Sequence, residues 1–68
     1  MTEKQKFAMV ILSIRAAGHD PIAQLAGYME TGNARYITRR NNARDLVQEI
    51  NRKTIRNYLE KHRPRKLA

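Results

Sequence analysis

Residues 20–32 read DPIAQLAGYMETG, and this stretch decides the fold class of the chain. Asp20-Pro21 is a strong helix start, because the carboxylate can accept from free amides of the first turn and proline tolerates the first helical position. Gly32 suits the left-handed conformation that closes a helix. Between them, apolar side chains recur at helical spacing, at Ile22, Leu25, Ala26 and Met29. The stretch therefore predicts a helix over residues 21–31.

The residues before this stretch predict a first helix over 4–17, ending at Gly18. Its apolar positions again follow helical spacing, at Phe7, Val10, Ile11 and Ile14. Met9 and Leu12 widen this apolar face beyond what one partner helix would cover. We therefore expect the first helix to be buried on two sides.

After Gly32, the apolar pattern lapses over residues 33–42, which predict a connector with at most one helical turn at 34–37. Helical spacing then returns twice, first at Ala43, Leu46, Val47 and Ile50, and again at Ile55, Tyr58, Leu59 and His62. These two stripes drift out of phase near residues 51–53, so a break into two helices is favoured over one long helix. Side-chain caps are available at Asn41 or Asn42 for the third helix and at Asn51 or Thr54 for the fourth.

The sequence therefore predicts a single all-α domain over residues 1–63, a compact bundle of about four short helices, followed by a disordered basic tail at 64–68 after the helix-ending Pro64. A chain of 68 residues has a thin stability margin, and without cysteine it has no disulfide to widen it. Oligomerisation would compensate, so we expect a homodimer. Its expected contact combines the apolar surplus of the first helix with the Gly27 face of the second, because a glycine inside a helix allows close approach of another helix.

The net charge of +8 arises from Arg35 onward, so the second half of the chain would attract a polyanion or an acidic protein. No apolar run is long enough to span a bilayer, and none resembles a cleavable secretory signal. Membrane insertion is therefore not expected, and cytoplasmic residence is.

Catalysis requires converging reactive groups, which this sequence offers poorly. It has no cysteine, a lone Ser13 on the first helix, and two histidines, His19 and His62, far apart in the chain. The carboxylates are better explained as a helix cap and solvated partners of nearby bases. We expect no enzyme, no cofactor and no metal site.

Nucleic-acid binding is the function that charge alone suggests, through the cationic side chains Arg39, Arg40, Arg44, Arg52, Lys53 and Arg56. A helix-turn-helix motif fits poorly, because Gly27, its best turn glycine, lies inside a helical pattern. A solvated basic face that keeps the protein soluble explains the same residues. Tyr28 and Tyr36 flank the connector, where packing is favoured over base stacking, and Arg44 can reach back across the connector toward carbonyl groups.

Three segments of the sequence together resemble the IreB family. They are residues 18–28 (GHDPIAQLAGY), residues 31–38 (TGNARYIT) and residues 41–44 (NNAR), and they match the family in order and without gaps. The resemblance covers about residues 10 to 60. We interpret the matching signature residues as structural positions and candidate contacts for a partner. They are Asp20, Pro21, Gln24, Gly27, Tyr28, Gly32, Tyr36, Asn42 and Arg44.

The resemblance implies a small helical homodimer that regulates cell-envelope stress signalling and antibiotic resistance as substrate of a transmembrane serine/threonine kinase and its partner phosphatase. Two features depart from the family. The phosphorylated N-terminal tail of the family is short here, leaving Thr2 as the candidate phosphorylation site. The last helix is basic where the family is acidic. The sequence thus favours a non-enzymatic regulator acting through protein contacts, with a small basic nucleic-acid-binding module as the alternative.

Overall fold

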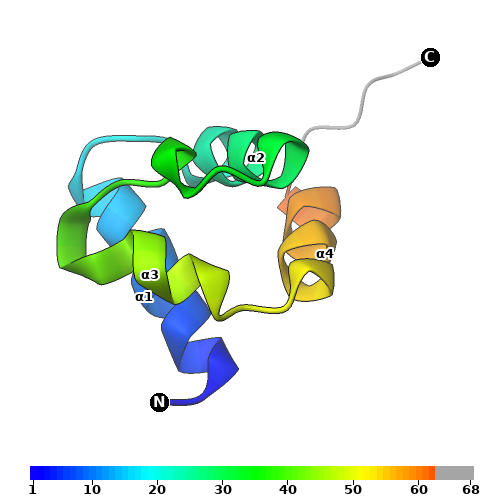
Figure 1. Cartoon of the computed structure of the whole chain (residues 1–68), viewed down its shortest axis with the longest axis horizontal. Helices are drawn as coiled ribbons and strands as arrows, with labels where there is room; N and C mark the ends of the chain where they lie inside the picture. The colour runs from blue at the N-terminus through cyan, green and yellow to red at the C-terminus, as the bar shows by residue number, and fades with distance from the viewer. Residues whose placement is uncertain (63–68) are drawn as a thin grey trace.

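The computed structural model describes residues 1–62, and these form four α-helices linked by short connections. The helices are α1 (Glu3–Ala16), α2 (Pro21–Thr31), α3 (Ala43–Gln48) and α4 (Arg52–His62), and the connector after α2 holds two 3-10 turns, η1 (Ala34–Tyr36) and η2 (Arg40–Asn42). In Figure 1, α1 and α3 lie together, α2 crosses on the other side of the core, and α4 closes one end. The all-α prediction and the separation of the last two helices are confirmed. Residue 63 and the predicted tail at 64–68 lie outside the described residues.

Helix α1 begins one residue earlier than predicted, because Thr2 and Gln5 form a reciprocal cap. The Thr2 hydroxyl accepts from the Gln5 amide at 3.1 Å, and the Gln5 side chain accepts from the Thr2 amide at 2.9 Å. On its inner face Val10 and Ile14 are fully buried against α2 and α3. Leu12, expected on a second buried side, instead points outward and is 59% exposed. A single chain therefore buries only part of the apolar surface of α1.

Every α-helix contributes to one hydrophobic core. Its buried apolar members are Val10, Ile14, Leu25, Tyr28, Ile37, Ala43, Val47, Ile50, Ile55 and Leu59. Phe7 of α1 meets Tyr58 of α4 edge-to-face, with ring centroids 5.2 Å apart. Since α4 also packs along α2, it closes one end of the core (Figure 1).

The turn before α3 is built by two consecutive asparagines in the left-handed conformation, Asn41 (φ 53°) and Asn42 (φ 59°). Asparagine tolerates this region better than most residues. Asn42 occupies the cap position of α3 with a left-handed backbone. Its side chain makes no capping hydrogen bond there, so this predicted cap is absent. The side-chain Nδ2 of Asn41 instead donates to the buried Ser13 hydroxyl at 3.2 Å, and that hydroxyl donates to the Met9 carbonyl at 2.7 Å. Asn41 thereby joins the turn to α1.

Candidate functional site

Three of the signature residues fix the two ends of α2. The Asp20 carboxylate accepts from the Ile22 amide at 3.0 Å, and Pro21 follows at the first helical position and is buried. At the other end, Gly32 adopts φ 71° and its amide donates to the Tyr28 carbonyl at 2.7 Å. The predicted helix start and stop are confirmed by these contacts.

Three further signature residues, Gln24, Gly27 and Tyr36, join the middle of α2 to the connector. A Cβ added at Gly27 would lie 2.5 Å from Cδ1 of Tyr36, so the tyrosine ring rests directly on the glycine backbone. The close approach expected at Gly27 is made within the chain by this side chain of the short 3-10 helix η1, and no α-helix of residues 1–62 fills that space. One turn earlier, the Gln24 side chain accepts from the Thr38 amide at 2.9 Å. The face of α2 that carries Gly27 therefore positions the connector.

Tyr28 packs in the core and is only 6% exposed, as the packing interpretation predicted. The guanidinium of Arg52 lies 5.7 Å from the centre of its ring. The same guanidinium donates to the Met29 carbonyl at 3.1 Å, near the C-terminal end of α2, where a positive charge is favourable. Arg52, predicted as a polyanion contact, thus joins α4 to α2.

Arg44 reaches back across the connector, as the sequence suggested. Its Nε donates to the Ile37 carbonyl at 2.8 Å, and its Nη2 donates to the Arg35 carbonyl at 3.3 Å. Asn42 lies two residues earlier, in the left-handed turn. With these two, the nine signature residues are complete: Arg44 lies in the first turn of α3, and the other eight lie in α2, in its caps or in the connector and turn that follow it.

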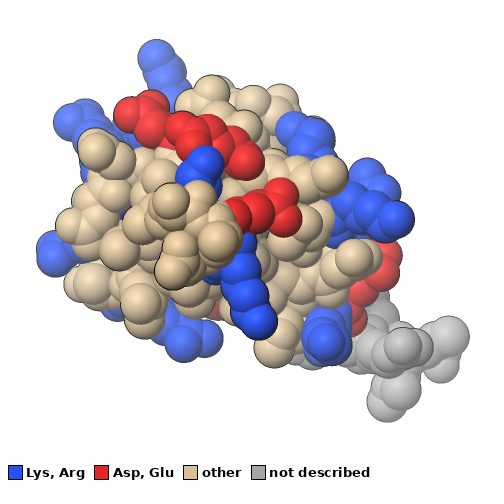
Figure 2. Space-filling view, turned by 90° about the horizontal axis from the view of Figure 1, so that it is seen from below, with Lys and Arg blue, Asp and Glu red and all other residues tan. Residues whose placement is uncertain are grey.

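The six predicted polyanion contacts do not form one surface. Arg39 and Arg40 lie in the connector at one end of the molecule, and Lys53 and Arg56 lie on α4 at the other, along a longest dimension of 38 Å (Figure 1). Arg44 and Arg52 are hydrogen-bonded to backbone carbonyls. On the face that Figure 2 shows, most Lys and Arg side chains are spread around the margin and others lie among acidic side chains near the centre, so no continuous basic patch is seen there.

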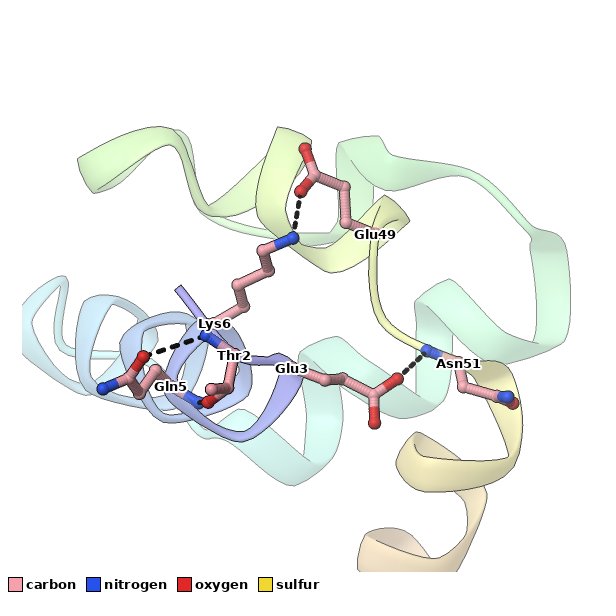
Figure 3. A network of polar contacts seen from close by, with 6 residues as sticks. All are labelled: Thr2, Glu3, Gln5, Lys6, Glu49 and Asn51. Atoms are coloured by element: carbon pink, nitrogen blue, oxygen red, sulfur yellow. Dashed lines mark hydrogen bonds and ion pairs between the residues drawn. The ribbon is translucent and has the colours of Figure 1, made fainter.

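The candidate phosphorylation site, Thr2, lies exposed at the start of α1, beside a polar network that reaches α4 (Figure 3). The Glu3 carboxylate accepts from the Asn51 amide at 2.8 Å and from the Thr54 hydroxyl at 3.0 Å. One turn along α1, Lys6 forms an ion pair of 2.7 Å with Glu49. The first turns of α1 are therefore tied to the end of α3 and the start of α4.

Sequence reasoning missed this network, because Glu3, Lys6 and Glu49 are ordinary charged residues on helix surfaces, with partners more than 40 residues away. It did anticipate Asn51 as a cap, and the Asn51 side chain accepts from the Lys53 amide at 2.8 Å. Thr54, the other cap candidate, uses its hydroxyl for Glu3 instead.

The described part of the chain shows little that could perform catalysis. His19 lies exposed between α1 and α2, and the His62 ring packs on that of Tyr58, with centroids 4.4 Å apart. In residues 1–62 no three histidine or acidic side chains gather as a metal site would require. None of the helices there has the length and apolar character needed to cross a membrane.

The fold and these sites define a small helical protein in which signature residues build a fixed connector and long-range polar contacts tie the start of α1 to the end of α3 and the start of α4. The family model described as IreB regulatory phosphoprotein matches residues 1–62, and the chain belongs to this family. This is a regulatory rather than a catalytic family. No solved structure matches the chain.

Proposed function

We propose that this chain is a non-enzymatic regulator that acts through protein–protein contacts, in cell-envelope stress and antibiotic-resistance signalling under a serine/threonine kinase and its phosphatase. Membership of a regulatory phosphoprotein family supports the class of function. The observation that carries the proposal is the position of Thr2, an exposed hydroxyl directly beside the Glu3 network that links α1 to α4.

Phosphorylation of Thr2 would act on this network through charge. A phosphate carries about −1.5 to −2 charges and is favoured at a helix N-terminus, where free amides point outward. It would lie next to the Glu3 carboxylate in the sequence and repel it. Since Glu3 accepts from Asn51 and Thr54, the modification would loosen the contact between the start of α1 and the start of α4.

The regulator is proposed to act as a homodimer. Leu12 is 59% and Met1 69% exposed, and a shallow groove of about 490 Å³ is lined by Met1, Met9, Leu46 and the two turn asparagines. A second copy placed on this side of α1 would cover apolar surface that the single chain leaves open. The Gly27 face is less suitable than expected, because Tyr36 occupies it.

Replacement of Thr2 in the bacterium that encodes the protein tests the proposal. Thr2→Ala removes the acceptor of the kinase, whereas Thr2→Asp keeps a helix cap and adds negative charge. We expect the two variants to change survival under a cell-wall antibiotic in opposite directions, with Thr2→Ser behaving as wild type. Equal survival of all strains at equal protein levels would refute phosphoregulation at Thr2.

A further inference from the structure

The connector presents a half-exposed aromatic side chain in a fixed position. Tyr36 is 49% exposed, although its ring rests on Gly27. The backbone around it is held by local hydrogen bonds, from the Tyr36 amide to the Asn33 carbonyl at 3.2 Å and from the Ile37 amide to the Ala34 carbonyl at 2.9 Å. A large, rigid and accessible aromatic ring loses little entropy when it is covered, which is typical of interface anchors.

A fixed positive charge lies beside this ring. Arg44 is held by the Ile37 and Arg35 carbonyls, that is, by the residues on either side of Tyr36. These two bonds use two of the five N–H groups of a guanidinium, and no other hydrogen bond joins its side chain to residues 1–62. The guanidinium is thus already oriented, is partly exposed, and keeps donors suited to a carboxylate.

The charge of the surrounding segment has one sign. Residues 33–44 contain four arginines and no acidic residue. Arg35, Arg39 and Arg40 are exposed, and no ion pair in the described range involves them. An acidic partner would therefore meet an uncompensated positive surface, with Tyr36 as its apolar centre.

We propose that Tyr36, Arg35 and Arg44 form a docking surface for an acidic segment of a partner protein, with one carboxylate on Arg44 and an aliphatic side chain against Tyr36. This inference rests on the proposed function, regulation through protein–protein contacts, and it identifies one surface through which such a contact is made. A protein is favoured over nucleic acid because the cations of α4 lie at the far end of the molecule, so no continuous basic track extends from this connector.

Amide spectra of the ¹⁵N-labelled full chain test the inference directly. The probe is a synthetic peptide with four glutamates around one leucine, and the same peptide with glutamines is its control. We expect the acidic peptide to shift amides of residues 33–38 and the Arg44 Nε–H, with affinity that falls as salt is raised. No shift at millimolar peptide, or shifts centred on α4, would overturn the inference.

Matched variants separate this surface from general attraction to a basic protein. Arg35→Gln and Arg56→Gln remove the same charge from exposed positions, one in the connector and one on α4. We expect the first to weaken binding about threefold or more and the second to leave it nearly unchanged. Arg44→Lys, which keeps the charge but loses the fixed planar fork, should also weaken binding. Equal losses in Arg35→Gln and Arg56→Gln would overturn the inference.

Two competing occupants give different results in the same experiment. If a thymidine oligonucleotide binds the same residues more tightly than the acidic peptide does, the occupant of this surface is nucleic acid and not an acidic protein segment. Shifts of residues 33–44 that depend on protein concentration alone would assign the surface to a second copy of the chain. Both outcomes overturn the inference, and neither bears on phosphorylation at Thr2, so the proposed function is tested separately.

Discussion

The Glu3 carboxylate accepts a hydrogen bond from the Asn51 amide at 2.8 Å, across 48 positions of the sequence. In a capping box, the third residue of a helix accepts from the amide of its own cap residue. In α4 that third residue is Thr54, whose hydroxyl donates to Glu3, so Glu3 supplies the missing acceptor from the start of α1. The beginning of the chain therefore completes the cap of its last helix.

Replacing Glu3 should accordingly destabilise the protein although the residue is exposed. We expect Glu3→Ala to lower the free energy of unfolding by about 0.5–1 kcal/mol, the typical net value of a hydrogen bond, which in a domain of this size lowers the melting temperature by several degrees. Urea denaturation measures the change. Glu30→Ala removes an exposed carboxylate from α2 and is the control. A loss no larger than that of the control would show that the Glu3 contacts contribute nothing to stability.

Gly27→Ala should destabilise the protein, contrary to the usual gain when alanine replaces glycine inside a helix. The added Cβ would lie 2.5 Å from Cδ1 and 3.0 Å from Cγ of Tyr36, so the ring must move. We expect a loss of about 1–3 kcal/mol, as for other overpacked sites. In a Tyr36→Ala background the clash is absent, and Gly27→Ala should be neutral or stabilising by up to about 1 kcal/mol. An equal loss in both backgrounds would exclude the ring contact as the cause.

Leu12→Glu should convert the proposed dimer into a folded monomer, because it places a charge on the exposed apolar side of α1. Sedimentation at micromolar concentration measures the mass, and circular dichroism confirms the helix content. Ala23→Glu adds the same charge at an exposed position of α2 and should leave the dimer intact. A folded wild-type monomer at these concentrations would remove the argument for a dimer.

Duplex DNA should bind weakly, because the cations form two separate groups at opposite ends of the molecule. We expect dissociation constants in the nonspecific range, roughly 10⁻⁴ to 10⁻⁶ M at physiological salt. Titration of a labelled duplex at several salt concentrations gives the affinity and the number of phosphates contacted. Nanomolar binding, lost in both Arg40→Gln and Arg56→Gln, would instead support the nucleic-acid alternative.

Short-range sequence patterns, namely the spacing of apolar residues and the capping residues, were sufficient to predict most of the helices. Asp20, Pro21 and Gly32 act through neighbouring backbone groups, so the bounds of α2 could be read from the sequence alone. Asn42 shows the limit of such reasoning. A capping residue type stands at the cap position, but the left-handed backbone of the turn leaves its side chain without the expected bond.

The candidate site was predictable in its residues but not in its arrangement. The signature positions were found from their sequence pattern, yet the pattern could not show that the Tyr36 ring covers Gly27 or that Arg44 is held by the carbonyls beside Tyr36. The basic residues were grouped because they follow one another in the sequence. The structure separates them, because α3 and the linker after it carry the chain from the connector to α4 at the other end of the molecule (Figure 1).

The sequence by itself determined the all-α class, the family and the start and end of α2, because helix periodicity and capping act over a few neighbouring residues. Only the tertiary structure decided which distant polar groups are hydrogen-bonded, as Glu3 is to Asn51, and which aromatic and basic groups stay available at the surface. Those pairings depend on how the helices pack around the shared core, and no spacing along the chain specifies contacts between residues 48 positions apart.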